Sequence, residues 1–138
     1  MYLRYIVSIV CLCLASTTVS ATVLTKKEIS KLEESITFEY RQGLKVCDTL
    51  NWNESDVCTA QANSKRDIDR AELKANVNPT AKSRYAALMA HMNGNHEVAI
   101  IKCDGVALSD KVACLSDAEG AKEIALQKAN NFWGKLIQ

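Results

Sequence analysis

The clearest pattern along the chain is a stripe of apolar residues that recurs at every third or fourth position. The first stripe comprises Ile29, Leu32, Ile36, Tyr40, Leu44 and Cys47. This spacing places one apolar face along an α-helix. Thr25 and Glu28 precede the stripe with the spacing of a capping box, in which each side chain accepts a hydrogen bond from the other residue's backbone. The pattern therefore predicts a helix that begins after Thr25 and reaches Cys47.

Three more helices follow from the same periodicity. The second begins after an Asn53 cap and carries mostly small residues on its inward face as far as Ala75. The third follows Pro79, the only proline, which suits a first helical turn with Asn78 as the cap. The fourth begins after a Ser109 cap. Its inward stripe comprises Cys114, Ala118, Ala121, Ala125, Ala129, Phe132 and Leu136.

The turn-forming sequence Asn93-Gly94-Asn95 interrupts the third stripe, which otherwise continues to Cys103. The segment 96–103 contains several β-branched residues, so a short strand is an alternative to helix there. A helix is favoured because a lone strand has no partner with which to pair.

Two cysteine pairs share one frame, with ten residues inside each pair. Cys47 and Cys58 form the first pair, and Cys103 and Cys114 recur 56 positions later. The frame predicts two disulfides, each closing the turn between two helices. Crossed pairing of Cys47 with Cys114 and of Cys58 with Cys103 is the alternative. A zinc site made by all four cysteines and catalytic thiol exchange are disfavoured, because the short Cys-containing turns typical of these sites are absent from the sequence.

These elements predict an all-α fold of two disulfide-stapled helical hairpins. An antiparallel four-helix bundle is the favoured arrangement, and two splayed long hairpins are the alternative. In the closed bundle, the aromatic end of the fourth helix, at Phe132 and Trp133, packs beside the start of the first helix.

The N-terminal segment has the features of a secretory signal. An uncharged apolar run follows Arg4, and small residues end at Ala21. Residues 1–21 are therefore predicted to be a cleaved signal peptide that carries away Cys11 and Cys13. The mature chain, residues 22–138, is then a single helical domain made of two repeats, at about 25–77 and 79–137. No later stretch is apolar enough to span a bilayer, so we expect a periplasmic or secreted protein.

The charge balance excludes two classes of partner. Seventeen basic and 16 acidic residues leave a net charge of +1, which gives no basic surface for nucleic acid or anionic membrane. The cluster Lys65-Arg66-Asp67 is interpreted as a solvated helix face. No catalytic arrangement and no cofactor motif is visible in the sequence. We therefore predict a non-enzymatic module for interaction or stress response, whose partner is an unknown protein or another component of the envelope.

One cluster of side chains offers an alternative function. Thioether and imidazole groups are suitable copper ligands, and they occur together at Met89, His91, Met92 and His96. The alternative is therefore periplasmic copper binding, although the methionines also fit the apolar stripe. Asn53-Glu54-Ser55 matches the glycosylation sequon, a pattern that is common by chance.

The chain also resembles a family of small exported proteins of Gram-negative bacteria, which are rich in Ala and Lys. The residues that carry the resemblance are Phe38-Glu39-Tyr40-Arg41, Cys47-Asp48, Val57-Cys58, Ala71-Glu72-Leu73-Lys74-Ala75, Pro79-Thr80-Ala81-Lys82, Tyr85, Glu97-Val98-Ala99, Lys102-Cys103-Asp104 and 112–114. The chain departs from the family pattern at Trp52 and at residues 93–95. The resemblance implies a periplasmic, helical, disulfide-bearing protein and brings no known activity.

Overall fold

Four antiparallel α-helices make up the part of the protein that the computed structural model describes, residues 24–136. They are α1 (Lys26–Cys47), α2 (Trp52–Val77), α3 (Ala81–Cys103) and α4 (Leu108–Leu136). Within residues 24–136 there is no strand, so the all-α prediction is confirmed. The predicted signal peptide at 1–21 lies outside the described residues.

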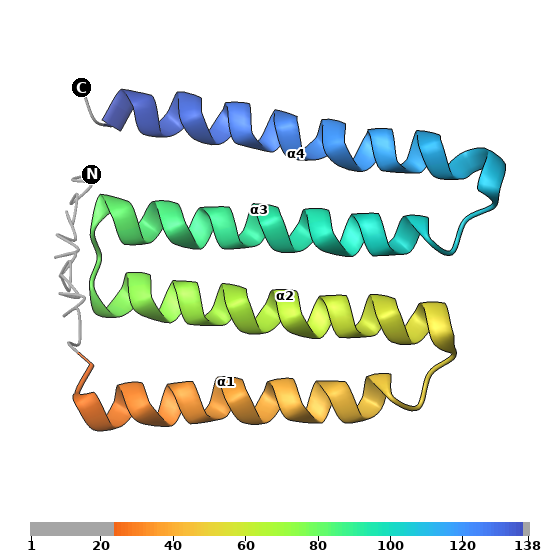
Figure 1. The fold of residues 1–138 in the computed structure, drawn as a ribbon. Helices are drawn as coiled ribbons and strands as arrows, with labels where there is room; N and C mark the ends of the chain where they lie inside the picture. The colour runs from red at the N-terminus through yellow and green to blue at the C-terminus, as the bar shows by residue number, and fades with distance from the viewer. Residues whose placement is uncertain (1–23, 137–138) are drawn as a thin grey trace, which may run out of the picture.

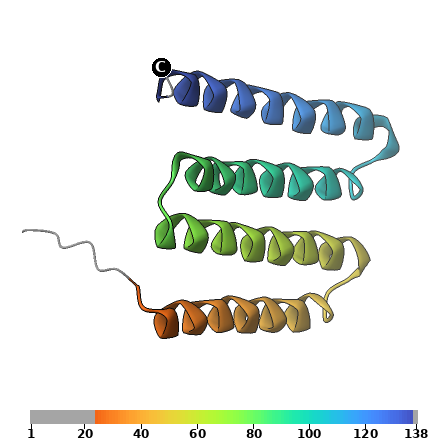
Figure 2. The ribbon, with the colours of Figure 1, turned by 60° about the vertical axis from the view of Figure 1, so that its left-hand side comes forward.

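The helices lie side by side in a single layer, in the order in which they occur along the chain (Figures 1 and 2). Helix α2 packs against α1 on one side and against α3 on the other, and α4 packs only against α3. Within the described residues α1 and α4 make no contact, because they form the two opposite edges of the layer. The predicted antiparallel bundle is thus present in an open form, with its two stapled hairpins joined edge to edge.

The predicted contact between the aromatic end of α4 and the start of α1 is wrong. Trp133 instead packs edge to face on Tyr85 of α3, with ring centroids 6.0 Å apart and an interplanar angle of 88°. The reason lies in α2, where Ala62 faces Gly43 of α1 and Ser64 faces Gly94 of α3. Residues two positions apart, such as Ala62 and Ser64, point about 200° apart around a helix axis. The two neighbours of α2 therefore lie on opposite sides of it, which gives a flat layer and not a closed bundle.

Capping boxes set the starts of α1 and α3. In α1 the backbone N–H of Thr25 donates to Glu28 Oε2 at 2.7 Å, and the N–H of Glu28 donates to Thr25 Oγ1 at 3.3 Å, as predicted. Helix α3 has Thr80 as its cap rather than Asn78, because Ser83 completes a reciprocal box with Thr80. Such a box satisfies two backbone donors, whereas a lone Asn cap satisfies only one.

The starts of α2 and α4 differ from the predicted ones. Helix α2 begins at Trp52 with Asn51 in the cap position, whereas Asn53 was the predicted cap. Helix α4 begins at Leu108, so Ser109 lies inside the first turn. Each helix therefore starts earlier than its polar cap candidate indicates, because the short stapled loop leaves few residues between the paired helices.

Helix α3 continues through Asn93-Gly94-Asn95 without a break, so the alternative of a strand at 96–103 is wrong. Gly94 is needed there because α2 approaches closely. A Cβ on residue 94 would lie 2.9 Å from the Cβ of Ser64 and 3.5 Å from its Cα. The glycine that suggests a turn in the sequence is a packing residue in the middle of a helix.

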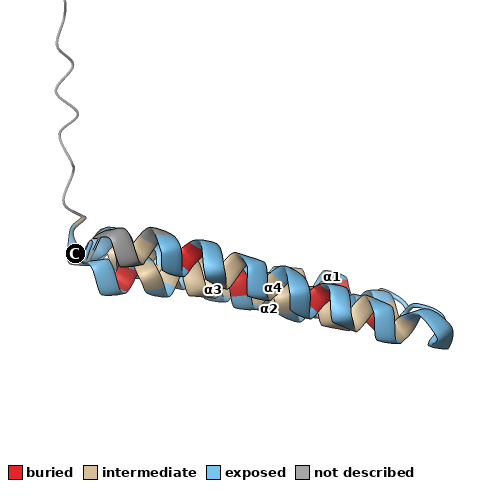
Figure 3. Ribbon diagram, turned by 90° about the horizontal axis from the view of Figure 1, so that it is seen from above, coloured by how far each residue is buried: buried red, intermediate tan, exposed pale blue. Residues whose placement is uncertain are grey.

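The core is thin because the layer is only one helix deep. Figure 3 shows the layer from its edge, with buried positions scattered along the helices among exposed ones. The buried residues are Cys47, Ala60, Ala75, Ser83, Met92, Cys103, Ala118 and Ala129. Most are small, so they let helices approach closely but remove little apolar area from water. Both broad faces of the layer remain open.

Candidate functional site

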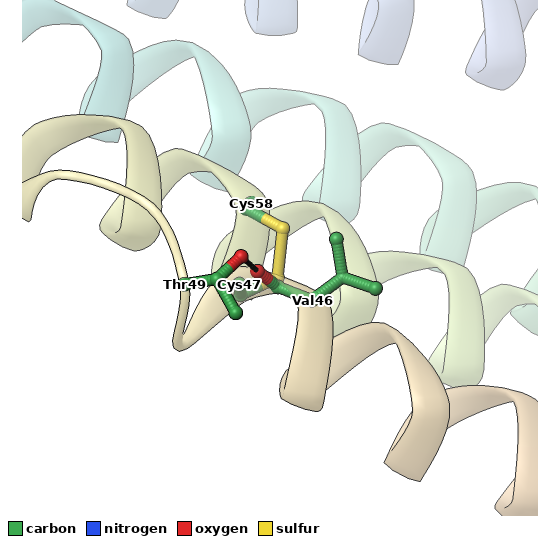
Figure 4. Close-up of a disulfide and its surroundings, with 4 residues drawn as sticks. All are labelled: Val46, Cys47, Thr49 and Cys58. Atoms are coloured by element: carbon green, nitrogen blue, oxygen red, sulfur yellow. Dashed lines mark hydrogen bonds between the residues drawn. A yellow bond between two sulfur atoms is a disulfide. The ribbon is translucent and has the colours of Figure 1, made fainter.

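The two disulfides join Cys47 to Cys58 and Cys103 to Cys114, as the repeated frame predicts. Their Cα atoms lie 5.4 and 5.7 Å apart, and both bonds staple a helix end to the next helix start. Figure 4 shows the first staple beside Thr49, whose hydroxyl donates to the carbonyl oxygen of Val46 at 2.7 Å. Because all four sulfurs are in disulfides, crossed pairing and a zinc site made of these thiolates are wrong.

The second stapled loop packs against the start of the first hairpin's α2. A Cβ on Gly105 would lie 2.8 Å from Cγ of Asn53, so a larger residue in the loop would displace this side chain. The amide nitrogen of Asn53 is buried and has no hydrogen-bond partner among the described residues. Glycosylation needs that nitrogen exposed, so the folded structure argues against use of the sequon at Asn53.

The structure does not bring the four candidate copper ligands together. His91 turns toward α2, where its Nε2 lies 2.6 Å from Oε1 of Glu72. His96 turns toward α4, where its Nε2 lies 2.9 Å from Oε1 of Glu119. Met92 is buried and Met89 is half-buried. Because α2 and α4 flank α3 on opposite sides, the two imidazoles cannot ligate one metal ion without rearrangement of the helix.

His96 lies at the centre of a polar cluster between α3 and α4. Its side chain is 11% exposed, and Lys122 Nζ lies 3.4 Å from Nδ1 on the side opposite Glu119. The contact of Nε2 with Glu119 has an ion-pair distance but lies off the direction of a hydrogen bond. A neutral imidazole that accepts from lysine at Nδ1 carries its proton on Nε2.

A second polar cluster joins α1 to α2. The hydroxyl of Tyr40 donates to Oδ1 of Asn63 at 2.8 Å, and the guanidinium of Arg66 lies 4.5 Å from the centroid of the Tyr40 ring. Nearby, Lys65 bridges Asp69 on its own helix and Glu39 on α1. The hydrogen bonds that Lys65 donates to these two carboxylates, the one to Asp69 first, raise the pKa of Lys65. The sequence interpretation of this segment as a solvated face therefore missed its contacts with α1.

The two clusters occupy positions that differ by the same offset as the cysteine pairs. Tyr40, Asn63 and Arg66 in the first hairpin correspond to His96, Glu119 and Lys122, each 56 residues later. In each trio the residue on the first helix contacts both residues on the second. The equivalent positions of the two trios can be read from the sequence, but their shared role is recognised only once the contacts between the helices are known.

A groove between α2 and α3 hollows the middle of one broad face, with a volume of about 680 Å³. The small residues Ala60, Ser64, Ala90 and Gly94 line it, and their size brings the two helices close while leaving space above them. Its polar lining comprises Asp56, Thr59, Asn63, Arg66, Asp67, Asn93 and Glu97. This groove was not predicted, because helical periodicity does not say which two helices become neighbours.

The charges along the groove are mainly negative. Three carboxylates, on Asp56, Asp67 and Glu97, face one guanidinium, on Arg66. Arg66 Nε lies 2.8 Å from Oδ1 of Asp67, and this hydrogen bond raises the pKa of the guanidinium. Arg66 is thus already paired, and the groove offers free carboxylate and amide acceptors to a cationic or hydrogen-bond-donating group.

Comparisons with models of protein families, with curated proteins and with solved structures gave no match to this chain. The resemblance to small exported proteins of Gram-negative bacteria therefore stays an expectation from the residues. Among residues 24–136, none of the helices has both the length and the apolar character that a membrane span needs.

Proposed function

We propose that this protein is an exported, non-enzymatic interaction module of the periplasm or the extracellular space. The observation that carries the proposal is the open single layer, which leaves a broad face with a polar groove between α2 and α3 available to a partner. Two disulfides support an oxidising compartment, since such bonds persist outside the cytosol. A stress-related role fits this stapled architecture, because short stapled loops resist unfolding.

The chemistry of the groove favours a basic partner. Its carboxylates outnumber its guanidinium, and Arg66 is neutralised by Asp67. The floor of small residues admits a side chain or an extended segment lying along the helices. We infer that the partner is a protein segment that presents Lys or Arg to Asp56 and Glu97. Such contacts at the surface weaken as salt is added.

The test compares two charge reversals near the start of α2. Asp56→Lys changes the groove, whereas Glu54→Lys changes an exposed acid of the same helix that does not line it. Each protein is cross-linked in envelope extract, and the captured partners are quantified by mass spectrometry. We expect Asp56→Lys to lose a partner that wild type and Glu54→Lys both retain, with capture falling as salt rises.

Two results would contradict the proposal. The first is equal capture by all three proteins, which would show that the groove is not used. The second is reproducible turnover of a substrate by the wild-type protein that a single substitution abolishes while the circular dichroism spectrum stays helical. The cross-linking experiment and the turnover assay thus test the site and the non-enzymatic function separately.

A further inference from the structure

Each of the two edges of the layer presents one side of a helix that contacts no other helix within the described residues. Helices α2 and α3 have neighbours on both sides, but α1 and α4 each have one. The outer side of α1 carries Phe38, whose exposed fraction is 61%. The outer side of α4 carries Ile124, which is 55% exposed. These exposed apolar residues mark both edges as surfaces that lack a covering neighbour.

The helix boundaries show which internal surface each edge resembles. Cys47 ends α1 and Cys103 ends α3, while Trp52 begins α2 and Leu108 begins α4, and both pairs differ by 56 positions. Residues 56 apart therefore occupy the same place on equivalent helices. The outer side of α4 corresponds to the side of α2 that packs on α3. Likewise, the outer side of α1 corresponds to the side of α3 that packs on α2.

Shape complementarity at the α2–α3 contact has a counterpart at the edges. Inside the chain, the side chain of Ser64 on α2 fills the space left by Gly94 on α3. Phe38 stands 56 positions before Gly94, and Gly120 stands 56 positions after Ser64. A Cβ on Gly120 would meet nothing within 4 Å. The bulky and the small residue have exchanged sides, so Phe38 of one chain fits over Gly120 of another.

The outer sides of the two edge helices differ in charge as well as in shape. Ile68 lines a second groove between α2 and α3, on the other broad face, and its counterpart on the outer side of α4 is Ile124. Along α1 the outer side is mostly basic, with Lys27, Lys31 and Lys45 against Glu34. Along α4 it carries Asp117 and Glu123 against Lys128. Opposite net charges on the two edges favour their association and disfavour pairing of like edges.

We propose that the outer edge of α4 binds the outer edge of α1 in a second copy of this chain, in the register of the internal α2–α3 contact. The interface is heterologous, so an open assembly keeps a free α1 edge at one end and a free α4 edge at the other, and it grows as a ribbon unless it closes on itself. This proposal concerns the edges and does not depend on the groove on the broad face. Failure of either proposal leaves the other untouched.

The first test uses two variants that each block one edge of the oxidised full protein. Phe38→Asp places a charge on the α1 edge, and Gly120→Glu fills the gap on the α4 edge. Phe38 is 61% exposed and a Cβ on residue 120 would meet nothing within 4 Å, so helicity by circular dichroism should match wild type. Trp52→Ser, at an exposed apolar residue of the inner helix α2, is the matched control.

We expect wild type and Trp52→Ser to grow in size with concentration in sedimentation velocity. Each edge variant alone should associate about thirtyfold more weakly or worse, the loss typical of a hot-spot residue. An equimolar mixture of Phe38→Asp and Gly120→Glu should form a dimer that grows no further, because one intact α4 edge meets one intact α1 edge. Wild type that stays monomeric at every concentration, or a mixture that stays monomeric, would overturn the proposal.

A cross-link provides a second readout of the register. Seven residues before Phe38 lies Lys31, and in the antiparallel register it comes within one turn of Glu123 on the neighbouring copy. Within one chain these two residues lie on opposite outer edges, so they cannot be joined by a zero-length reagent. A carbodiimide should therefore link Lys31 to Glu123 only between copies, which a mixture of isotopically light and heavy protein reveals. Links confined to single copies, or between two α1 edges, would contradict the register.

Discussion

The two hairpins share one staple and one set of helix boundaries but differ in what holds their helices together. Between α1 and α2 the apolar side chains of Ile36 and Leu44 are only half-buried, and the helices are also joined by hydrogen bonds of Tyr40 with Asn63 and of Lys65 with Glu39. Between α3 and α4 the chain buries Met92 and packs Tyr85 on Trp133. The polar cluster at His96 is added to this apolar contact rather than replacing it.

This difference teaches where the stability of each hairpin comes from. Polar contacts at a surface exchange hydrogen bonds with water, so each contributes only about 1 kcal/mol or less. A buried apolar side chain removes area from water and contributes about 1.5–3 kcal/mol. We therefore expect the first hairpin to depend on its disulfide and the second to retain structure through packing.

The largest effect is expected from removing the staples. Replacing Cys47 and Cys58 by serine should cost about 3 kcal/mol of unfolding free energy by loop closure, and so should replacing Cys103 and Cys114. The consequences should differ between the hairpins, because the apolar side chains of α1 that face α2, Ile36 and Leu44, are only half-buried. Hydrogen exchange should show α1 losing protection in the first variant, while α4 keeps most of its protection in the second. Equal loss of protection in α1 and α4 would contradict the expected difference between the hairpins.

A smaller effect is expected at matched apolar positions. Met92→Ala should lower the unfolding free energy by about 2–3 kcal/mol, since it empties a buried site between α3 and α4. Ile36, the residue 56 positions earlier, is only half-buried between α1 and α2. Its replacement by alanine should cost about 1 kcal/mol. Urea denaturation of both variants measures the difference, and a larger cost at Ile36 would contradict it.

A smaller difference between the hairpins is expected in the coupling free energies of their polar clusters, which double-mutant cycles measure. Tyr40→Phe combined with Asn63→Ala should give a coupling free energy of about 1 kcal/mol, as expected for one part-buried hydrogen bond. His96→Ala combined with Glu119→Ala should give about 0.5 kcal/mol, because the Glu119 side chain is 64% exposed. A coupling of the second pair above that of the first would show that the histidine cluster is a stabilising centre in its own right.

The smallest expected effect is a difference in how the two capping boxes respond to acidic pH. Hydrogen bonds from the backbone and hydroxyl of Thr25 lower the pKa of Glu28 below its ordinary value of 4.5. A lowered folded-state pKa means that the stabilisation is complete above 4.5 and is lost as the pH falls through the folded value. Ser83 in the box of α3 does not titrate there. Acidification should therefore fray the start of α1 before that of α3, and Glu28→Gln should remove the difference in amide exchange.

Much of the fold was predictable from local patterns. Helical periodicity, the capping box at Thr25 and Glu28 and the repeated cysteine frame are properties of neighbouring residues, and the structure confirms all three. Less was predictable of the helix starts, where Thr80 with Ser83 outweighed Asn78 with Pro79 as the cap. A cap depends on the reciprocal hydrogen bonds that the residue three positions later completes, and Asn78 and Thr80, two positions apart, compete to cap the same helix.

The candidate site was much harder to predict. The groove between α2 and α3 arises because Ser64 and Gly94 bring two helices together, and the sequence alone suggests a turn at Gly94. The Met and His residues are adjacent in the chain, yet His91 and His96 contact helices on opposite sides of α3. Closeness in sequence on a helix says little about which neighbour each side chain meets.

The sequence by itself determined the helical class, the two staples and the offset of 56 residues that relates them. Only the tertiary structure decided that the helices form an open layer instead of a closed bundle, with α1 and α4 apart within the described residues. The physical reason lies in α2, where small residues on two opposite sides admit two neighbours. Helical periodicity shows that one face of a helix carries apolar or small side chains. It does not show which helix packs on each face, and that choice sets whether the helices form a layer or a closed bundle.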